Sequence, residues 1–170
     1  MPQPTWRGST VQTYEGTLDG RRLKIAIVAS RFNETISKRL VDGARHALQQ
    51  HGVADDDMSL TWVPGAFEIP VVARRLALSG EVDAVVAIGV VIRGETAHFE
   101  YVAGAAATGV ANASLETGVP ISFGVLTTET TEQAAERAGG KLGNKGYEAA
   151  TTAIEMANLG ASLPKPQSDM

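Results

Sequence analysis

Residues 83–92 read DAVVAIGVVI, and this apolar run decides the fold. β-branched side chains dominate it without alternation, which is typical of a parallel strand covered on both faces. The run is too short to cross a membrane, because a spanning helix needs roughly 20 apolar residues. Residues 93–96 then turn the chain into a segment of helical period that ends near Gly118. The stretch therefore predicts a buried central strand followed by a helix that packs on the sheet.

Similar units stand on either side of this strand. Short apolar runs alternate with segments of helical period, as in helices wrapped on a parallel sheet. The other predicted strands are residues 22–29, 59–63 and 121–126, and the other predicted helices are residues 34–51, 67–78, 131–138 and 145–159. Asn33 is expected to cap the first of these helices, and Thr130 with Gln133 to form a capping box. Residues 11–18 are a further candidate strand, either at a sheet edge or paired with another subunit.

Length and composition indicate one folded domain. The chain has 170 residues, of which 44% are hydrophobic and 20% charged, so it can bury a core without disulfides or a structural metal. We expect residues 14–159 to form that domain. Residues 1–13 are expected to be a flexible N-terminal tail and residues 160–170 a C-terminal tail.

Charge and cysteine content exclude several classes of function. The net charge of −4 gives no overall basic field for nucleic acid or acidic lipid, so any anion must bind locally. The chain has no Cys, which removes thiolate metal sites and Cys nucleophiles. Its His and carboxylate residues lack the spacing of metal ligands, and we expect neither a metal nor a cofactor. The first residues lack the pattern of a secretory signal, which favours a cytoplasmic location.

The turns after the predicted strands carry the candidate chemistry. In an open α/β sheet, ligands bind beyond the carboxyl ends of the strands, so these turns should meet. Phe32 could stack on a flat heterocycle, or it could simply pack on the next helix. Glu68 could accept hydrogen bonds from ligand hydroxyls, or serve as a favourable charge at a helix start. His98 lies in a first helical turn, where a neutral imidazole is favoured and could exchange protons near pH 7, although a lone helical His is more often structural.

Two segments are candidates for binding an anion. The amides of residues 94–96 precede a helix and could bind an anion at its positive end; alternatively, Thr96 is an ordinary N-cap. Lys141 and Lys145 flank the start of the last helix, where cations oppose the helix dipole, and Arg137 lies before them. This basic turn either serves an anion or is a solvated loop.

Four motifs resemble the lumazine synthase family. They are PGAFEIP at residues 64–70, VIRGETAHF at residues 91–99, FGVLTT at residues 123–128 and GNKG at residues 143–146. The similarity runs in order from about residue 14 to residue 159, and several motifs together are more specific than any one. The resemblance implies a flavodoxin-like three-layer α/β/α fold with a four-stranded parallel sheet. It also implies an N-terminal edge strand that pairs with a neighbouring subunit.

The resemblance further implies an activity. Members of that family make 6,7-dimethyl-8-ribityllumazine, the precursor of riboflavin, from 5-amino-6-(D-ribitylamino)uracil and 3,4-dihydroxy-2-butanone 4-phosphate, with release of water and phosphate. Two alternatives stay open: a riboflavin synthase of the same fold, which dismutates two lumazines, and a non-catalytic shell or flavin-binding module. Residues 64–68 and the basic turn favour the first activity, because only that enzyme must bind a free phosphate ester.

Residue roles follow from the same resemblance. Phe32 would stack on the pyrimidine, and Glu68 would hold the ribityl hydroxyls. His98 would move protons, while phosphate would lie against the backbone at Glu95 and Thr96 and against Arg137. The adjacent subunit would supply Phe123 and Arg137, with Lys145 nearby and Lys141 as a weaker candidate. Glu95 departs from the small residue that is also common there, and we expect its side chain to point to solvent. The implied substrate-binding set is Phe32, Ala66, Phe67, Glu68, Val90, Val91, Ile92, Glu95, Thr96, Phe123, Arg137 and Lys145.

An assembly is implied as well. Members form pentamers, and in some of them twelve pentamers close into an icosahedral shell. The short connection at residues 139–146 resembles that of the shell-forming members, so we expect a 60-mer. Riboflavin synthase is a further expected partner, and neither nucleic acid nor membrane is expected.

Overall fold

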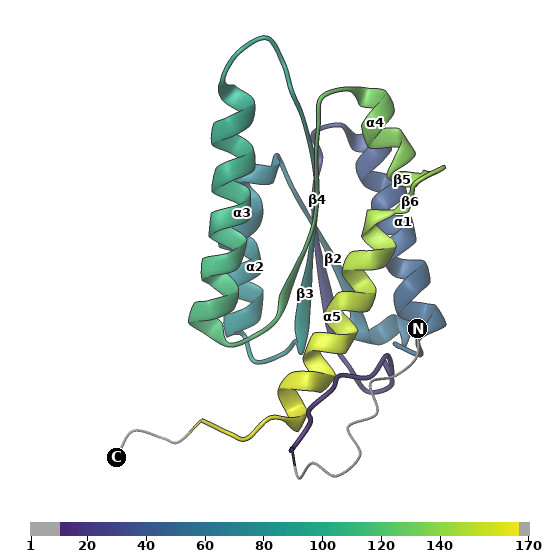
Figure 1. Cartoon of the computed structure of the whole chain (residues 1–170), viewed down its shortest axis with the longest axis vertical. Coiled ribbons are helices and arrows are strands. Elements are labelled where there is room, and N and C mark those ends of the chain that lie inside the picture. Colours follow the sequence, from purple (N-terminus) through teal and green to yellow (C-terminus); the bar gives the residue numbers. More distant parts are fainter. Residues whose placement is uncertain (1–10, 167–170) are drawn as a thin grey trace.

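A four-stranded parallel sheet forms the centre of the computed structural model, which describes residues 11–166 (Figure 1). Its strands are β1 (Ile25–Ser30), β2 (Met58–Val63), β3 (Ala84–Ile92) and β4 (Ile121–Thr128), in the order β2-β1-β3-β4. This order and the parallel register confirm the predicted flavodoxin-like α/β fold. The two inner strands, β1 and β3, are apolar throughout because both of their faces are covered.

Helices cover both faces of the sheet. Helices α1 (Glu34–Gln50) and α5 (Lys145–Ser162) pack on one face, and α2 (Ile69–Leu78) and α3 (His98–Thr117) pack on the other (Figure 1). Alternate residues of β1 belong to the two cores: Ile25 and Ile27 face α1 and α5, whereas Ala26 and Val28 face α2 and α3. One strand therefore supplies two hydrophobic layers.

Small residues let the elements approach closely. A Cβ built on Gly146 would lie 1.9 Å from the carbonyl oxygen of Leu40, so α5 starts directly against α1. A Cβ on Gly109 would lie 2.6 Å from Cγ of Pro70, which brings α3 against the start of α2. Glycine at both positions is therefore required by packing.

Local details differ from the sequence prediction at Asn33. Its backbone is left-handed, with φ 57, and its side chain makes no capping bond. The Nδ2 atom instead donates to the carbonyl oxygen of Val90, 3.3 Å away. The prediction of a side-chain cap at Asn33 is therefore wrong, because a tertiary partner on β3 takes the amide.

The helix predicted for residues 67–78 is divided. A 3₁₀ turn, η2 (Ala66–Glu68), precedes α2, and Pro70 lies in the first turn of α2 as expected. The short helix α4 (Thr131–Glu136) follows β4. The hydroxyl of Thr130 accepts the Gln133 N–H at 3.2 Å, while Oε1 of Gln133 accepts the N–H of Glu129 rather than that of Thr130. The expected capping box is thus present with one partner shifted by a residue.

Two segments near the ends of the described chain also differ from expectation. Helix α5 continues to Ser162, so the predicted end at residue 159 is wrong by three residues. Residues 11–20 form no strand, and Asn158 on α5 donates to the carbonyl oxygens of Thr17 and Asp19 at 2.8 and 2.9 Å. Strand pairing with a neighbouring subunit stays a prediction. The parts of the expected tails at residues 1–10 and 167–170 lie outside the described residues.

Two short elements were not expected. Strands β5 (Ala138–Gly140) and β6 (Gly143–Asn144) form an antiparallel hairpin within the predicted basic turn. Gly139 and Gly143 have φ values of +90 and +81, which favour glycine at both positions. The 3₁₀ turn η1 (Asp55–Asp57) precedes β2.

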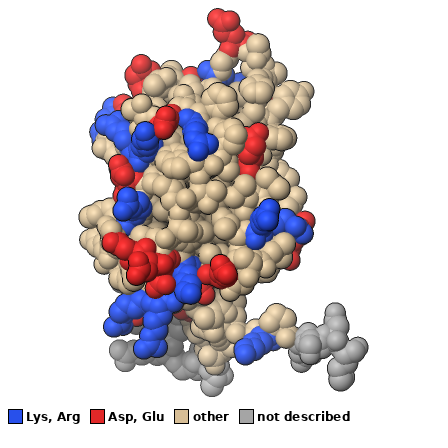
Figure 2. All heavy atoms as spheres, turned by 180° about the vertical axis from the view of Figure 1, so that it is seen from behind, with Lys and Arg blue, Asp and Glu red and all other residues tan. Residues whose placement is uncertain are grey.

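Charge on the surface is mixed. On the face opposite the view of Figure 1, Lys and Arg side chains are interspersed with Asp and Glu (Figure 2). This face shows no continuous basic field, in keeping with the inference that an anion must bind locally. Within residues 11–166, none of the helices has the length and apolar character needed to traverse a lipid bilayer.

Candidate active site

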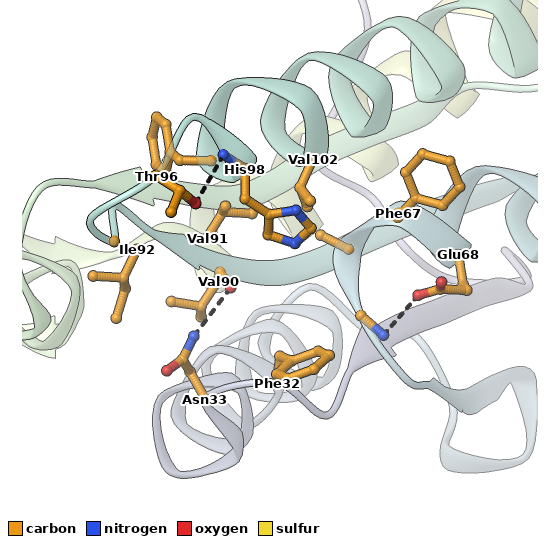
Figure 3. A pocket seen from close by; sticks show the side chains of 14 residues that line it. Phe32, Asn33, Phe67, Glu68, Val90, Val91, Ile92, Thr96, His98 and Val102 are labelled. Carbon is orange, nitrogen blue, oxygen red and sulfur yellow. Dashed lines mark hydrogen bonds between the residues drawn. The ribbon is translucent and has the colours of Figure 1, made fainter.

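A cavity of about 570 Å³ opens beyond the carboxyl ends of β1 and β3 (Figure 3). Chain connections leave these adjacent strands in opposite directions, which makes this the topological switch point of the sheet. The lining comes from four segments: the turn after β1, the η2 turn, the end of β3 and the start of α3. Among the described residues, no Arg or Lys lines this cavity.

Phe32 presents an aromatic face at this cavity. It lies in the turn after β1, where its backbone N–H donates to the carbonyl oxygen of Pro64 at 3.1 Å. The residue is 69% exposed although it is large and apolar. A Cβ built on Gly65 would lie 3.0 Å from Cδ2 of Phe32, so glycine lets the ring lie against the η2 turn. An exposed ring held in this way can stack on a planar ligand.

Glu68 supplies a carboxylate to the same cavity. Its Oε2 accepts the backbone N–H of Gly65 at 2.8 Å, which fixes the side chain at the cavity wall (Figure 3). The residue is half-buried. A carboxylate held by one bond retains further lone pairs for ligand hydroxyl groups. Phe67, its neighbour in η2, is 61% exposed and also lines the cavity.

His98 is the first residue of α3 and lines the cavity. Figure 3 shows its imidazole between the side chains of Val91 and Phe67. The backbone N–H of His98 donates to Oγ1 of Thr96 over 3.4 Å. The side chain of Thr96 therefore supports the start of α3 with one long hydrogen bond. Gly94 and Thr96 line the cavity, which places the start of α3 beside it. Glu95 is exposed and lies outside the cavity lining.

The end of β3 forms another wall. Val90, Val91 and Ile92 line the cavity together with Ala66. Asn33 lines it too, and its amide holds the carbonyl oxygen of Val90. The sequence analysis assigned Asn33 only a capping role. Its position directly after an aromatic residue at a strand end could have indicated that it lines the cavity, because Asn tolerates the left-handed backbone found in such turns.

Arg93 connects the start of α3 to the loop after β4. Its guanidinium pairs with Glu100 and with Glu129, the latter at 2.8 Å between Nε and Oε2. The same group lies 4.4 Å from the ring centroid of Phe99. The hydrogen bond from Arg93 holds the pKa of the Glu100 carboxyl below its ordinary value, and the bonds to Glu100 and Glu129 raise the pKa of Arg93.

A second cavity, of about 400 Å³, lies along β4, whose outer edge has no strand partner within the described chain. Phe123, Arg137 and Lys145 line it, with Ser122 and Thr128 of β4. Arg137 donates to the carbonyl oxygen of Gln133 at 2.9 Å, and Lys145 pairs with Glu148 at 2.6 Å. This cavity is therefore the cationic one.

Lys141 lies apart from the lining of both cavities. Its side chain is 73% exposed and pairs with Glu136 at 3.0 Å. The two cavities share no lining residue. Within one chain, the predicted site residues thus form two groups: Phe32, Ala66, Phe67, Glu68, Val90, Val91, Ile92, Thr96 and His98 in one, and Phe123, Arg137 and Lys145 in the other.

The arrangement provides an aromatic face, a carboxylate and an imidazole at one place, and a cationic hollow at another. Across residues 11–166, no three His, Asp or Glu side chains gather as metal ligands. A comparison with family models matches residues 22–161 to 6,7-dimethyl-8-ribityllumazine synthase. That match covers most of the chain and includes both cavities. The chain therefore belongs to the 6,7-dimethyl-8-ribityllumazine synthase family, and it is a transferase of riboflavin biosynthesis.

Proposed function

We propose that this protein condenses 5-amino-6-(D-ribitylamino)uracil with 3,4-dihydroxy-2-butanone 4-phosphate to give 6,7-dimethyl-8-ribityllumazine. The family match supports the reaction class. The assignment of the site rests on the different side chains of the two cavities. The cavity with Phe32 and His98 has no Arg or Lys among its described lining residues, whereas the second cavity is lined by Arg137 and Lys145. A reaction of a planar heterocycle with a phosphate ester requires both kinds of surface.

The first cavity suits the ribitylaminouracil. The pyrimidine would stack on Phe32, and its polar edge would bond to the backbone of Ala66 and of residues 90–92. Glu68 would accept hydrogen bonds from the ribityl hydroxyls. Phe67 would cover the ribityl chain, because its exposed ring lies at the wall of the cavity. These contacts fix the 5-amino group without a cationic partner.

The phosphate would bind between the two groups of residues. Amides at Glu95 and Thr96 lie just before α3, near the helix end where an anion is favoured. Arg137, with Lys145 nearby, would neutralise the remaining charge from the adjacent subunit, and Phe123 of that subunit would complete the wall. The Glu95 side chain is exposed outside the lining, so backbone amides rather than its carboxylate would face the phosphate.

The chemistry then needs proton transfer and positioning. The 5-amino group attacks the ketone carbon, and loss of water gives an imine. Loss of the proton on C3 and departure of the phosphate from C4 leave an enol, which tautomerises to a ketone at C3. The ribitylamino nitrogen then attacks this new ketone, and loss of a second water closes the ring. His98 would accept and return these protons. A placed acid/base contributes about 10²- to 10⁴-fold in rate, and holding the two substrates together contributes the remainder.

An interfacial site requires an oligomer. The first cavity of each subunit would meet the second cavity of the next. Such head-to-tail contacts can form a closed ring, as in the pentamer expected from the family resemblance. The exposed edge of β2 would accept the N-terminal segment of a neighbour as a further strand. Closure of twelve such rings into a 60-mer, association with riboflavin synthase and a cytoplasmic location stay predictions.

The direct test mixes the two substrates with the purified protein and follows the absorbance and fluorescence of the lumazine. Continuous formation of lumazine with release of one phosphate per product is expected. Formation of riboflavin from added lumazine would instead favour the dismutating enzyme. Failure of both reactions would leave the non-catalytic module as the explanation and would refute the proposal.

A complementation experiment tests the shared site. His98→Ala and Arg137→Ala chains, each nearly inactive, are co-expressed so that they assemble together. If each site combines the first cavity of one chain with the second cavity of the next, random mixing restores about a quarter of the sites. Recovery of that activity supports the interfacial site. Mixed assemblies as inactive as their components would show that both residues act within one chain.

A further inference from the structure

Arg93 occupies a position that the proposed reaction does not use. It follows β3 directly, and its backbone N–H donates to the carbonyl oxygen of Thr128 at 2.9 Å. Its side chain is 37% exposed, whereas a cation with no structural partner would extend into solvent. The guanidinium is held on three sides: by Glu100 and Phe99 of α3 and by Glu129 of the loop after β4.

These contacts fix the first turn of α3. Glu100 and Phe99 immediately follow His98, and Phe99 also lines the first cavity. The other end of the bridge, Glu129, follows Thr128 of β4, which pairs with Ile92 at the end of β3. The N-cap position of α3 is Ala97, which has no side-chain cap; the His98 N–H makes the 3.4 Å contact with Thr96, and the Glu100 N–H donates to the carbonyl oxygen of Ala97 at 3.1 Å. The Arg93 bridge therefore ties a poorly capped helix start to the edge of the sheet.

We propose that Arg93 is a positioning residue, which holds the first turn of α3 so that the His98 imidazole stays directed into the cavity. This inference rests on the proposed function and deepens it, since it concerns the same site. Arg93 lies outside the lining of the first cavity, so it acts through its neighbours and not on the substrate. A planar guanidinium can serve two carboxylates and a ring face together, which an ammonium cannot do.

The chain offers a matched control at the other end of the same helix. Arg74 on α2 pairs with Glu116 near the end of α3, at 2.8 Å; its side chain is 51% exposed, compared with 37% for Arg93, and the carboxylate partners of both are exposed to a similar degree. Arg93→Met removes two ion pairs and a ring contact, and Arg74→Met removes one ion pair to the same helix. Only the first removes support from the turn that carries His98.

The first measurement is hydrogen–deuterium exchange of the assembled protein, which needs no activity. Arg93→Met should raise the exchange rate of amides at residues 99–102 by about tenfold, whereas Arg74→Met should leave them unchanged. Unchanged exchange in Arg93→Met would overturn the proposal, whatever the enzyme does. If the wild-type protein makes no lumazine, the proposed function is refuted. The role of Arg93 in holding the first turn of α3 is still tested by the exchange measurement alone.

The second measurement is a double-mutant cycle on kcat at saturation with both substrates. Arg93→Met should lower kcat by about tenfold, and Arg93→Lys, which keeps the charge but not the planar group, should recover part of the loss. In a His98→Gln background, Arg93→Met should cause little further loss, because both changes remove the same function. Losses that multiply, or a kcat equal to that of Arg74→Met, would show that Arg93 does not act through His98.

Discussion

Asn144 joins the start of α5, which lines the cationic cavity, to α1. Its Oδ1 accepts the backbone N–H groups of Gly146 and Tyr147 at 2.8 and 3.1 Å, so it caps α5. Its Nδ2 donates to the carbonyl oxygen of Arg39 on α1 at 2.9 Å. The next residue, Lys145, donates its backbone N–H to the carbonyl oxygen of Arg137. Loss of Asn144 should therefore weaken both the helix and the attachment of the basic hairpin.

The size of the effect follows from these bonds. An N-cap contributes about 1 kcal/mol, and a hydrogen bond between elements contributes about the same, so Asn144→Ala should reduce the free energy of unfolding by about 2 kcal/mol. For a domain of this size that corresponds to a decrease in Tm of about 4–8 °C. Asn144→Ser retains a capping oxygen but cannot reach Arg39, and it should lose about half as much.

Gly43→Ala is a useful control, because such a substitution inside a helix ordinarily raises stability, whereas here we expect it to lower stability. Replacing a glycine inside a helix by Ala normally stabilises by about 0.5–1 kcal/mol. Here a Cβ on Gly43 would lie 2.3 Å from Cγ of Asn144 and would push the amide away from Arg39. Gly43→Ala should therefore lower Tm, although it removes no polar group.

Thermal unfolding followed by circular dichroism checks these values. All variants are compared at one protein concentration, because assembly contributes to apparent stability. An Asn144→Ala variant within about 1 °C of wild type would refute the reasoning, given the 2–4 °C per kcal/mol expected for this size. A Gly43→Ala variant that melts above wild type would show that the contact with Asn144 is easily relieved.

Three further predictions concern catalysis, burial and pH. His98→Gln should lower the single-turnover rate by about 10²- to 10⁴-fold without abolishing the reaction, and an unchanged rate would exclude the proton-transfer role. Ser30→Ala should raise Tm by a few degrees, because Oγ of Ser30 is fully buried and has no hydrogen-bond partner among the described residues; a lower Tm would show that the hydroxyl is satisfied in solution. The hydrogen bond from Arg21 lowers the pKa of Asp19 from 3.8 to about 2, so this pair stabilises the folded state above pH 3.8, and its contribution is lost as the pH falls to about 2. Arg21→Gln should therefore reduce Tm at pH 5 but have little effect near pH 2, and a Tm difference independent of pH would contradict the assignment.

Much of the candidate site could be predicted before the structure. Phe32, Glu68 and His98 follow different strands, and the rule that ligands bind at the carboxyl ends of parallel strands predicts that they meet. The structure places all three in one cavity. The family resemblance predicted a cationic partner surface, and the structure places Arg137 and Lys145 together in a separate cavity along β4.

Local sequence patterns were sufficient for the four strands of the parallel sheet, most helix ends and the division into buried and exposed faces, but not for the β5–β6 hairpin. Apolar periodicity and capping residues act within one or two turns of chain, so they can be read directly. The positions of Asn33, Asn144 and Arg93 depended on tertiary partners. Asn33 bonds Val90, 57 residues away, and Asn144 bonds Arg39, 105 residues away. Such partners are set by the path of the whole chain through the sheet, because a side chain takes the best acceptor that folding brings near and not the nearest one in sequence.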